Sequence, residues 1–214
     1  MLGRDSAFSC VRCHSDLENH RALCTRCSIR KPAPLSALYA GARYQTPAIQ
    51  RAVRLLKYRG AHRLALPLGA FLAERVLPPQ TRLVFDLRNA VVVSVPLAPR
   101  KKRQRGFNQS ALLAAAFAER CGLPHLADAV VKARKTPSQV EMLTRAARRT
   151  NLRGAFVAQL PEGIRGKTVL LIDDVITTGA TMSEVAATLR RAGAMRVIGV
   201  ALAKSETKGY NLGE

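Results

Sequence analysis

Residues 169–181 of the chain read Val-Leu-Leu-Ile-Asp-Asp-Val-Ile-Thr-Thr-Gly-Ala-Thr. The apolar run predicts a buried strand over Thr168–Ile172 that delivers two adjacent carboxylates, Asp173 and Asp174, at its exit. A turn of small and hydroxyl-bearing residues follows, and it leads into a helix predicted over Thr181–Ala192 and closed by Gly193. Open α/β sheets bind ligands at the carboxyl ends of their strands. Backbone N–H groups and a helix N-terminus favour anions, so the stretch predicts a phosphate cradle.

Strands and helices alternate outward from this stretch. The spacing of apolar residues predicts helices over Thr46–Leu56, Leu64–Leu77, Asn108–Cys121 (with Asn108 as N-cap) and Gln139–Thr150, and strands over Ala90–Val95, Ala129–Lys132 and Arg196–Leu202. This alternation predicts an α/β fold with a largely parallel sheet flanked by helices. Pro and Gly residues around positions 31–41 predict one boundary, which separates a small domain at 1–35 from a larger one at 36–214.

Four of the five cysteines lie in the first 27 residues, in the pattern C-x2-C-x10-C-x2-C formed by Cys10, Cys13, Cys24 and Cys27. Two such pairs present four thiolates tetrahedrally, which is typical of a structural Zn²⁺ ribbon. A segment this short cannot build an adequate core alone, so a metal would fold it. Disulfides are one alternative, which a reducing compartment disfavours, and an iron–sulfur cluster is another.

Basic residues dominate the charge of the chain. Thirty-five Lys and Arg residues oppose 14 Asp and Glu residues, which gives a net charge of +21 at pH 7. Such an excess indicates an anionic partner, either a phosphorylated ligand, a nucleic acid or both, while solvated surface charge is the alternative. The densest basic run follows the strand predicted over Ala90–Val95 and comprises Arg100, Lys101, Lys102, Arg103 and Arg105. Gly106 then permits close approach of the backbone to a ligand.

The size and composition of the chain favour a globular protein. It has 214 residues, of which 48% are hydrophobic and 23% are charged. No apolar run approaches the roughly 18 residues that a membrane span requires, and the N-terminus lacks the apolar stretch of a secretion signal. We therefore expect a cytoplasmic protein.

The stretch 173–181 resembles the phosphoribosyl-pyrophosphate (PRPP) loop of type I phosphoribosyltransferases. Other segments resemble the ComF family, a group with this fold behind a four-cysteine zinc ribbon: Lys57–Gly60; Val95–Arg100 with Arg103 and Arg105–Gln109; Arg134–Gln139 with Leu143, Arg148 and Asn151; and Gly154–Phe156. Together with the cysteines, the resemblance covers essentially the whole chain. Two positions depart from it, since Ala98 stands where His is frequent and Gln104 where Glu is frequent. Ala98 argues against any proposal that a His handles a proton at this position.

The resemblance implies binding of PRPP with Mg²⁺ and transfer of ribosyl 5-phosphate from pyrophosphate to an acceptor. Asp173 and Asp174 would be the catalytic pair and would hold the ribose hydroxyls, directly or through the metal. The 5′-phosphate would be bound by Thr177, Thr178, Gly179, Ala180 and Thr181. The pyrophosphate side would be formed by Arg100, Arg103, Arg105 and Gly106, and these cations suit a leaving group that departs as an anion.

The ComF resemblance also implies a role in DNA uptake during competence, with single-stranded DNA and a helicase-like protein as partners. Two functions follow: a PRPP-dependent transferase, or a single-stranded-DNA-binding accessory protein whose PRPP site is regulatory or vestigial. The DNA contacts would come from Lys101, Lys102, Arg145, Arg148 and Arg149. Aromatic residues make up only 5% of the chain, with no Trp, so we expect mostly electrostatic DNA contacts rather than a long stacking platform.

Overall fold

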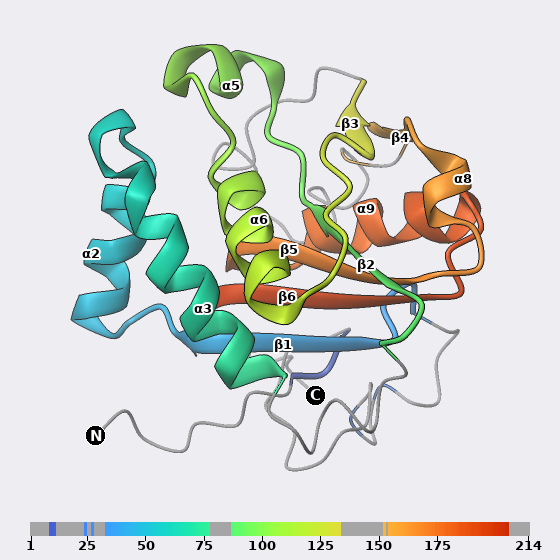
Figure 1. Cartoon of the computed structure of the whole chain (residues 1–214), viewed down its shortest axis with the longest axis horizontal. Coiled ribbons are helices and arrows are strands. Elements are labelled where there is room, and N and C mark those ends of the chain that lie inside the picture. The colour runs from blue at the N-terminus through green and yellow to red at the C-terminus, as the bar shows by residue number, and fades with distance from the viewer. Residues whose placement is uncertain are drawn as a thin grey trace, which may run out of the picture.

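The computed structural model describes residues 9–11, 24, 27, 33–77, 87–133, 152 and 154–205. Its centre is a four-stranded sheet in the order β1-β6-β5-β2, with every neighbouring pair parallel (Figure 1). The strands are β1 (Ala37–Arg43), β2 (Ala90–Ser94), β5 (Thr168–Ile176) and β6 (Arg196–Lys204). Because all four strands run the same way, their carboxyl ends share one edge of the sheet.

Helices cover both faces of this sheet (Figure 1). Between β1 and β2 lie α2 (Pro47–Leu56), a 3₁₀ helix (Arg59–Leu64) and α3 (Ala65–Val76). After β2 come α5 (Pro99–Arg105) and α6 (Gln109–Cys121). They are followed by β3 (Val130–Lys132) and β4 (Phe156–Ala158), which form an antiparallel pair, and by α8 (Pro161–Ile164). Helix α9 (Ala180–Arg191) follows β5. Helices α2, α3 and α6 pack on one face, whereas α9 packs on the other. No helix in these described ranges is long and apolar enough to cross a membrane.

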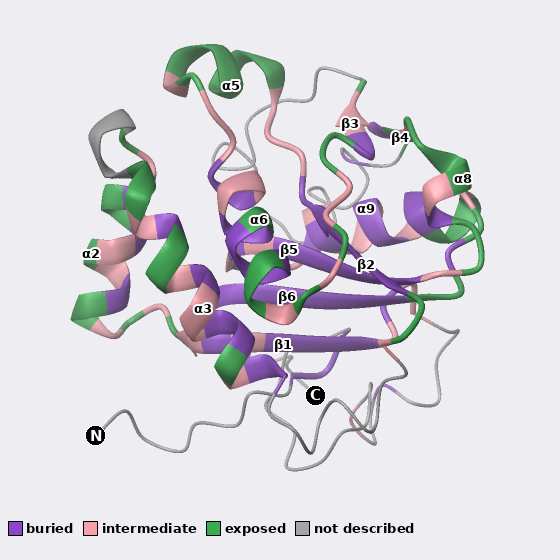
Figure 2. Ribbon diagram, in the orientation of Figure 1, coloured by how far each residue is buried: buried purple, intermediate pink, exposed green. Residues whose placement is uncertain are grey.

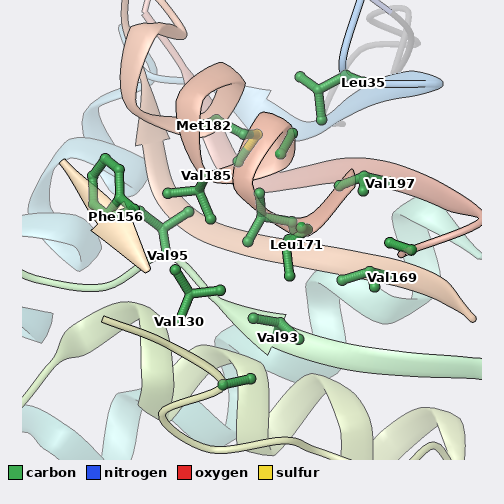
Figure 3. Packing of buried hydrophobic residues seen from close by; sticks show 14 of the residues in the cluster. Leu35, Val93, Val95, Val130, Phe156, Val169, Leu171, Met182, Val185 and Val197 are labelled. Atoms are coloured by element: carbon green, nitrogen blue, oxygen red, sulfur yellow. The ribbon is translucent and has the colours of Figure 1, made fainter. Parts of the chain in front are cut away.

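Two hydrophobic clusters sandwich the sheet, and β5 contributes alternate residues to them. Val169 and Leu171 belong to the cluster that contains Met182 and Val185 of α9 (Figure 3). Leu170 and Ile172 belong to the other cluster, which also holds apolar residues of α2, α3 and α6. A parallel strand buried on both faces needs such a continuous apolar run. Burial on both sides therefore explains why 168–172 is so readily recognised in the sequence.

The predicted α/β class with a parallel sheet is confirmed, and the helices predicted over Thr46–Leu56, Leu64–Leu77 and Asn108–Cys121 are observed as α2, α3 and α6. Asn108 is the N-cap of α6, because its side chain accepts a hydrogen bond from Ser110 N at 3.1 Å. The helix predicted over Gln139–Thr150 lies outside the described residues. The basic run 99–105 forms the helix α5, which the sequence analysis did not predict.

Strand β1 occupies much of the stretch in which Pro and Gly residues predicted a domain boundary. Its sequence, Ala-Leu-Tyr-Ala-Gly-Ala-Arg, is rich in small residues and therefore lacks a clear β-branched signal. The strand forms because β6 pairs with it along its length, and Ser9 N donates to Leu38 O on its other side at 3.0 Å. The division at residues 35 and 36 stays a prediction.

Candidate functional site

The two carboxylates lie inside β5, near its C-terminal end. The last pair between β2 and β5 is Ser94 with Ile172, whereas β6 remains paired with β5 as far as Ile176. The prediction that the strand ends at Ile172 is therefore wrong, because β5 continues to Ile176 through its pairing with β6 alone. Asp173 and Asp174 are the first residues of β5 that are not paired with β2, so the chain leaves the sheet after β2 beside these two residues.

Asp173 is held by two hydrogen bonds to one of its oxygens. Ser110 Oγ donates to Asp173 Oδ1 at 2.8 Å, and the backbone N–H of Asp174 donates to the same oxygen at 2.9 Å. Burial raises the pKa of Asp173 well above its ordinary value, and the neighbouring charge of Asp174 raises it further, although the hydrogen bond from Ser110 opposes both. A cation placed near this carboxylate would favour its ionised form.

Asp174 is buried and already faces a cation. Lys57 Nζ, at the C-cap of α2, lies 3.3 Å from Asp174 Oδ2, and the two side chains are 33% and 10% exposed. Gln109 Nε2, in the first turn of α6, lies 3.5 Å from the same oxygen, while Val175 N donates to Oδ1 at 2.9 Å. The acidic pair thus joins three elements: β5, the end of α2 and the start of α6.

A tight turn follows β5 and opens α9. Gly179 is the N-cap of α9 and has a φ of 64°, a left-handed conformation that favours glycine. Of the predicted phosphate-binding residues, Thr177 is exposed, Thr178, Gly179 and Thr181 are half-buried and Ala180 is buried. The N-terminal N–H groups of a twelve-residue helix and these hydroxyl groups follow directly after the carboxylates, an arrangement that suits an anion.

Helix α5 stands out from the body of the protein and has no buried residue (Figure 2). Arg100, Lys101, Lys102 and Arg103 are exposed, and Lys102 Nζ lies 3.6 Å from Asp128 Oδ1. Arg105 is half-buried, and its Nη1 donates to Gln109 Oε1 at 2.8 Å. Since Gln109 also contacts Asp174, the structure connects Arg105 to the acidic pair. For Arg100 and Arg103 it shows only a place on the same exposed helix.

Three residues that contact the acids were not among the predicted site residues: Lys57, Gln109 and Ser110. Lys57 belongs to a segment that resembles the ComF family, but nothing in the sequence predicted its contact with Asp174. Gln109 and Ser110 are buried polar residues at the start of an apolar helix. Polar residues at the first turn of a helix are common, so only the fold reveals that these two face β5.

Residues 9–11, which include Cys10, pack against the sheet at β1, where Val11 shares a hydrophobic cluster with Leu38. The sulfur atoms of Cys10, Cys24 and Cys27 lie within 4.8 Å of one another, an arrangement that is compatible with a metal site. Ser9 Oγ is 3.1 Å from Lys204 Nζ at the end of β6. Cys13 lies outside the described residues, as do Arg145, Arg148 and Arg149, so no structural statement applies to these four predicted site residues.

Comparison with known proteins agrees with this architecture. The family model "Phosphoribosyl transferase domain" matches residues 108–211. The chain is 34% identical to "DNA utilization protein YhgH" of Salmonella typhimurium over 91% of this chain and 83% of the relative. It is 33% identical to the protein of that name from Escherichia coli, over 88% of this chain and 80% of the relative. It is 28% identical to "Competence protein F" of Haemophilus influenzae, over 86% and 79% respectively.

A solved structure titled as the glutamine PRPP amidotransferase from B. subtilis complexed with ADP and GMP superposes with a TM-score of 0.44 and 24% identity, over 66% of this chain and 26% of that one. The family model and the fold define the class: a protein with a type I phosphoribosyltransferase-like domain. Within that class, the chain belongs to the ComF family, together with the YhgH proteins and Competence protein F.

Proposed function

We propose that the chain binds PRPP together with Mg²⁺ at the carboxyl edge of the sheet and transfers ribosyl 5-phosphate from it. The observation that carries the proposal is the position of Asp173 and Asp174 inside the end of β5, immediately before an anion cradle at the start of α9. Carboxylates suit ribose hydroxyls and a hard divalent cation, while the cradle suits a 5′-phosphate. The donor set fits Mg²⁺, since two adjacent carboxylates supply the hard oxygen ligands that this cation takes.

Each part of the site has a defined task in this reaction. The bond between C1 of the ribose and pyrophosphate breaks, its electron pair leaves with pyrophosphate, and the acceptor forms the new bond to C1. Asp173 and Asp174 stabilise the positive charge that develops on the sugar, and Arg100, Arg103 and Arg105 with the backbone at Gly106 stabilise the leaving pyrophosphate. Thr177, Thr178, Gly179, Ala180 and Thr181 hold the 5′-phosphate. Bound Mg²⁺ would offset the negative charge of the ligand and of the carboxylates.

The direct test is calorimetric titration of the protein with PRPP and Mg²⁺. We expect binding by the wild type and none by Asp173→Asn/Asp174→Asn, because the double variant loses its ribose and metal contacts but keeps its core packing. Glu74→Gln is a matched control, since Glu74 is an exposed carboxylate of α3 that pairs with Arg120. Unchanged affinity in the double variant would refute the site, and pyrophosphate release in a screen of bases and amines would establish transfer.

We also propose that Cys10, Cys13, Cys24 and Cys27 hold one structural Zn²⁺ in a ribbon within residues 1–35. The convergence of three of these sulfurs supports the proposal. Elemental analysis should give one zinc per chain, and Cys10→Ser should lose it, whereas Cys121→Ser on α6 should not. Iron in freshly purified protein would contradict the assignment and favour the iron–sulfur alternative.

A second function, binding of single-stranded DNA, is favoured by one observation: α5 presents its basic residues without burying any of them. The relatives carry the names "DNA utilization protein" and "Competence protein F", which agree with a role in DNA uptake. A helicase-like partner rests on the family resemblance alone. Fluorescence anisotropy of a labelled oligonucleotide across a salt series tests the DNA function, with a log–log slope of about −0.7 expected for each phosphate neutralised.

A further inference from the structure

A pocket lies beside the acidic pair, between the C-terminal end of α2 and α5. It has a volume of about 400 Å³ and is lined by Arg54, Lys57, Tyr58, Gln104 and Arg105. Lys57 is also the ion-pair partner of Asp174, so the pocket adjoins the end of β5. Three of these five lining residues are cations and none is acidic. The pocket therefore favours an anionic ligand.

Tyr58 gives this pocket an aromatic wall. This residue is 68% exposed, the largest value among the exposed large hydrophobic residues in the described part of the chain. Helix α2 packs into the core through Ile49, Val53 and Leu56, and Tyr58 follows its C-cap, so the ring is not part of that buried face. An exposed aromatic ring set among cations offers a surface on which a base can stack while Arg and Lys hold the adjoining phosphates.

We propose that this pocket binds one nucleotide unit of a single-stranded nucleic acid, with the base stacked on Tyr58 and the adjoining phosphate on Arg54. The inference rests on the second proposed function, DNA binding, and adds to it a site that contacts bases. Charge and composition alone predicted mostly electrostatic contacts and no long stacking platform, because aromatic residues are scarce in this chain. The fold places one aromatic residue, Tyr58, where it can stack with a single base.

The arrangement of α5 favours an extended polyanion over a small phosphate. Gln104 and Arg105 line the pocket, and the exposed cations Arg100–Arg103 continue along the same helix. A seven-residue helix spans about 10 Å at 1.5 Å per residue. These side chains thus extend the positive surface beyond the pocket, where a strand could continue but a mononucleotide could not reach.

The experiment compares two ligands of equal length and charge: labelled oligothymidylate and an abasic phosphodiester strand. We expect the wild type to prefer the base-bearing strand. Tyr58→Ala should weaken oligothymidylate binding by roughly 5- to 150-fold, the range for loss of one stacked base, and leave the abasic strand unchanged. Tyr58→Phe should retain the preference. Leu66→Ala, which removes another exposed apolar side chain (59%), is the matched control and should change neither affinity.

A second pair of variants separates charge from stacking. Arg54→Gln should lower the magnitude of the salt slope by about 0.7 for both strands, whereas Arg196→Gln, at the opposite edge of the sheet, should not. Tyr58→Ala and Arg54→Gln should both bind PRPP with wild-type affinity. Equal wild-type affinity for the two strands, or an unaffected Tyr58→Ala variant, would overturn the Tyr58 assignment alone. Absence of any strand binding at ~50 mM salt would overturn the DNA function as well, with the PRPP titration still standing.

Discussion

The acidic end of β5 and the basic helix α5 lie at the same edge of the sheet but are built in opposite ways. Asp173 and Asp174 sit in a strand fixed by β6 and are contacted by Ser110, Gln109 and Lys57. Helix α5 buries no residue and exposes most of its cations to solvent. Two adjacent carboxylates, one half-buried and one buried, destabilise the fold unless other groups support them, whereas exposed cations cost little. The two carboxylates are therefore held in fixed positions by their neighbours, whereas the Lys and Arg residues of α5 act mainly through their positive charge.

The strongest test of this contrast alters the turn after the acids. Gly179→Val forces a β-branched residue into a left-handed conformation at the start of α9, so the N–H groups of the cradle must move. We expect PRPP affinity to fall by at least about 100-fold, with a stability loss of ~1–3 kcal/mol. Calorimetric titration with PRPP and Mg²⁺ measures the first effect and chemical denaturation the second.

Gly122→Val controls for backbone strain. Gly122 also has a positive φ, 67°, but it caps the C-terminal end of α6 and no atom lies within 4 Å of the position of an added Cβ. We expect a comparable loss of stability and no change in PRPP affinity. If both variants lose PRPP equally, general destabilisation rather than the geometry of the cradle would explain the result.

The second test concerns the cost of burying the acids. Because the pKa of Asp173 is raised in the folded chain, the folded state holds this proton more tightly than the unfolded state. Stability therefore decreases as pH rises from the unfolded-state pKa, about 3.9, through the folded-state pKa, and stays low above it. Asp173→Asn removes this penalty and can still accept the hydrogen bonds from Ser110 and the backbone.

We expect metal-free Asp173→Asn to unfold at a higher temperature than the wild type at pH 7, by a few degrees, since about 1 kcal/mol corresponds to ~2–4 °C in a chain of this size. The difference should shrink as pH falls toward 4. Scanning calorimetry across pH measures it. Asp128→Asn, at a carboxylate that is 77% exposed, should show no such pH-dependent gain. A lower unfolding temperature for Asp173→Asn at pH 7 would contradict a raised pKa.

The same contrast explains what the sequence reveals. The strand run 168–172 is recognisable in the sequence because burial on both faces requires apolar residues. The turn into α9 is recognisable because its left-handed conformation favours glycine. Strand β1 escapes prediction, since its small residues take their structure from pairing with β6. Helix α5 escapes as well, because a helix with no buried residue leaves no apolar periodicity.

The contacts of the acids depend on tertiary structure in a further way. Lys57 and Asp174 are far apart in sequence, and only the folded chain brings Nζ of the α2 C-cap to 3.3 Å from the carboxylate. The pocket at Tyr58 depends likewise on the approach of α2 to α5. A local pattern can identify which residues carry charge, but not which charges from distant segments meet.

The smallest effect on the fold should come from α5, and it separates the two proposed ligands on one helix. Lys101→Gln/Lys102→Gln removes two exposed cations, so we expect stability to change by less than about 0.5 kcal/mol. The magnitude of the DNA salt slope should fall by about 1.4, from two phosphate contacts at ~0.7 each, and PRPP affinity should remain. Arg100→Gln/Arg103→Gln should lower the slope similarly and also weaken PRPP binding, because these arginines face pyrophosphate in the proposed site. Lys167→Gln/Arg196→Gln, at the opposite edge of the sheet, is the matched control. If both α5 variants alter PRPP binding equally, the helix affects PRPP through its overall positive charge rather than through particular contacts. If only the salt slope changes in both variants, the pyrophosphate does not bind at α5.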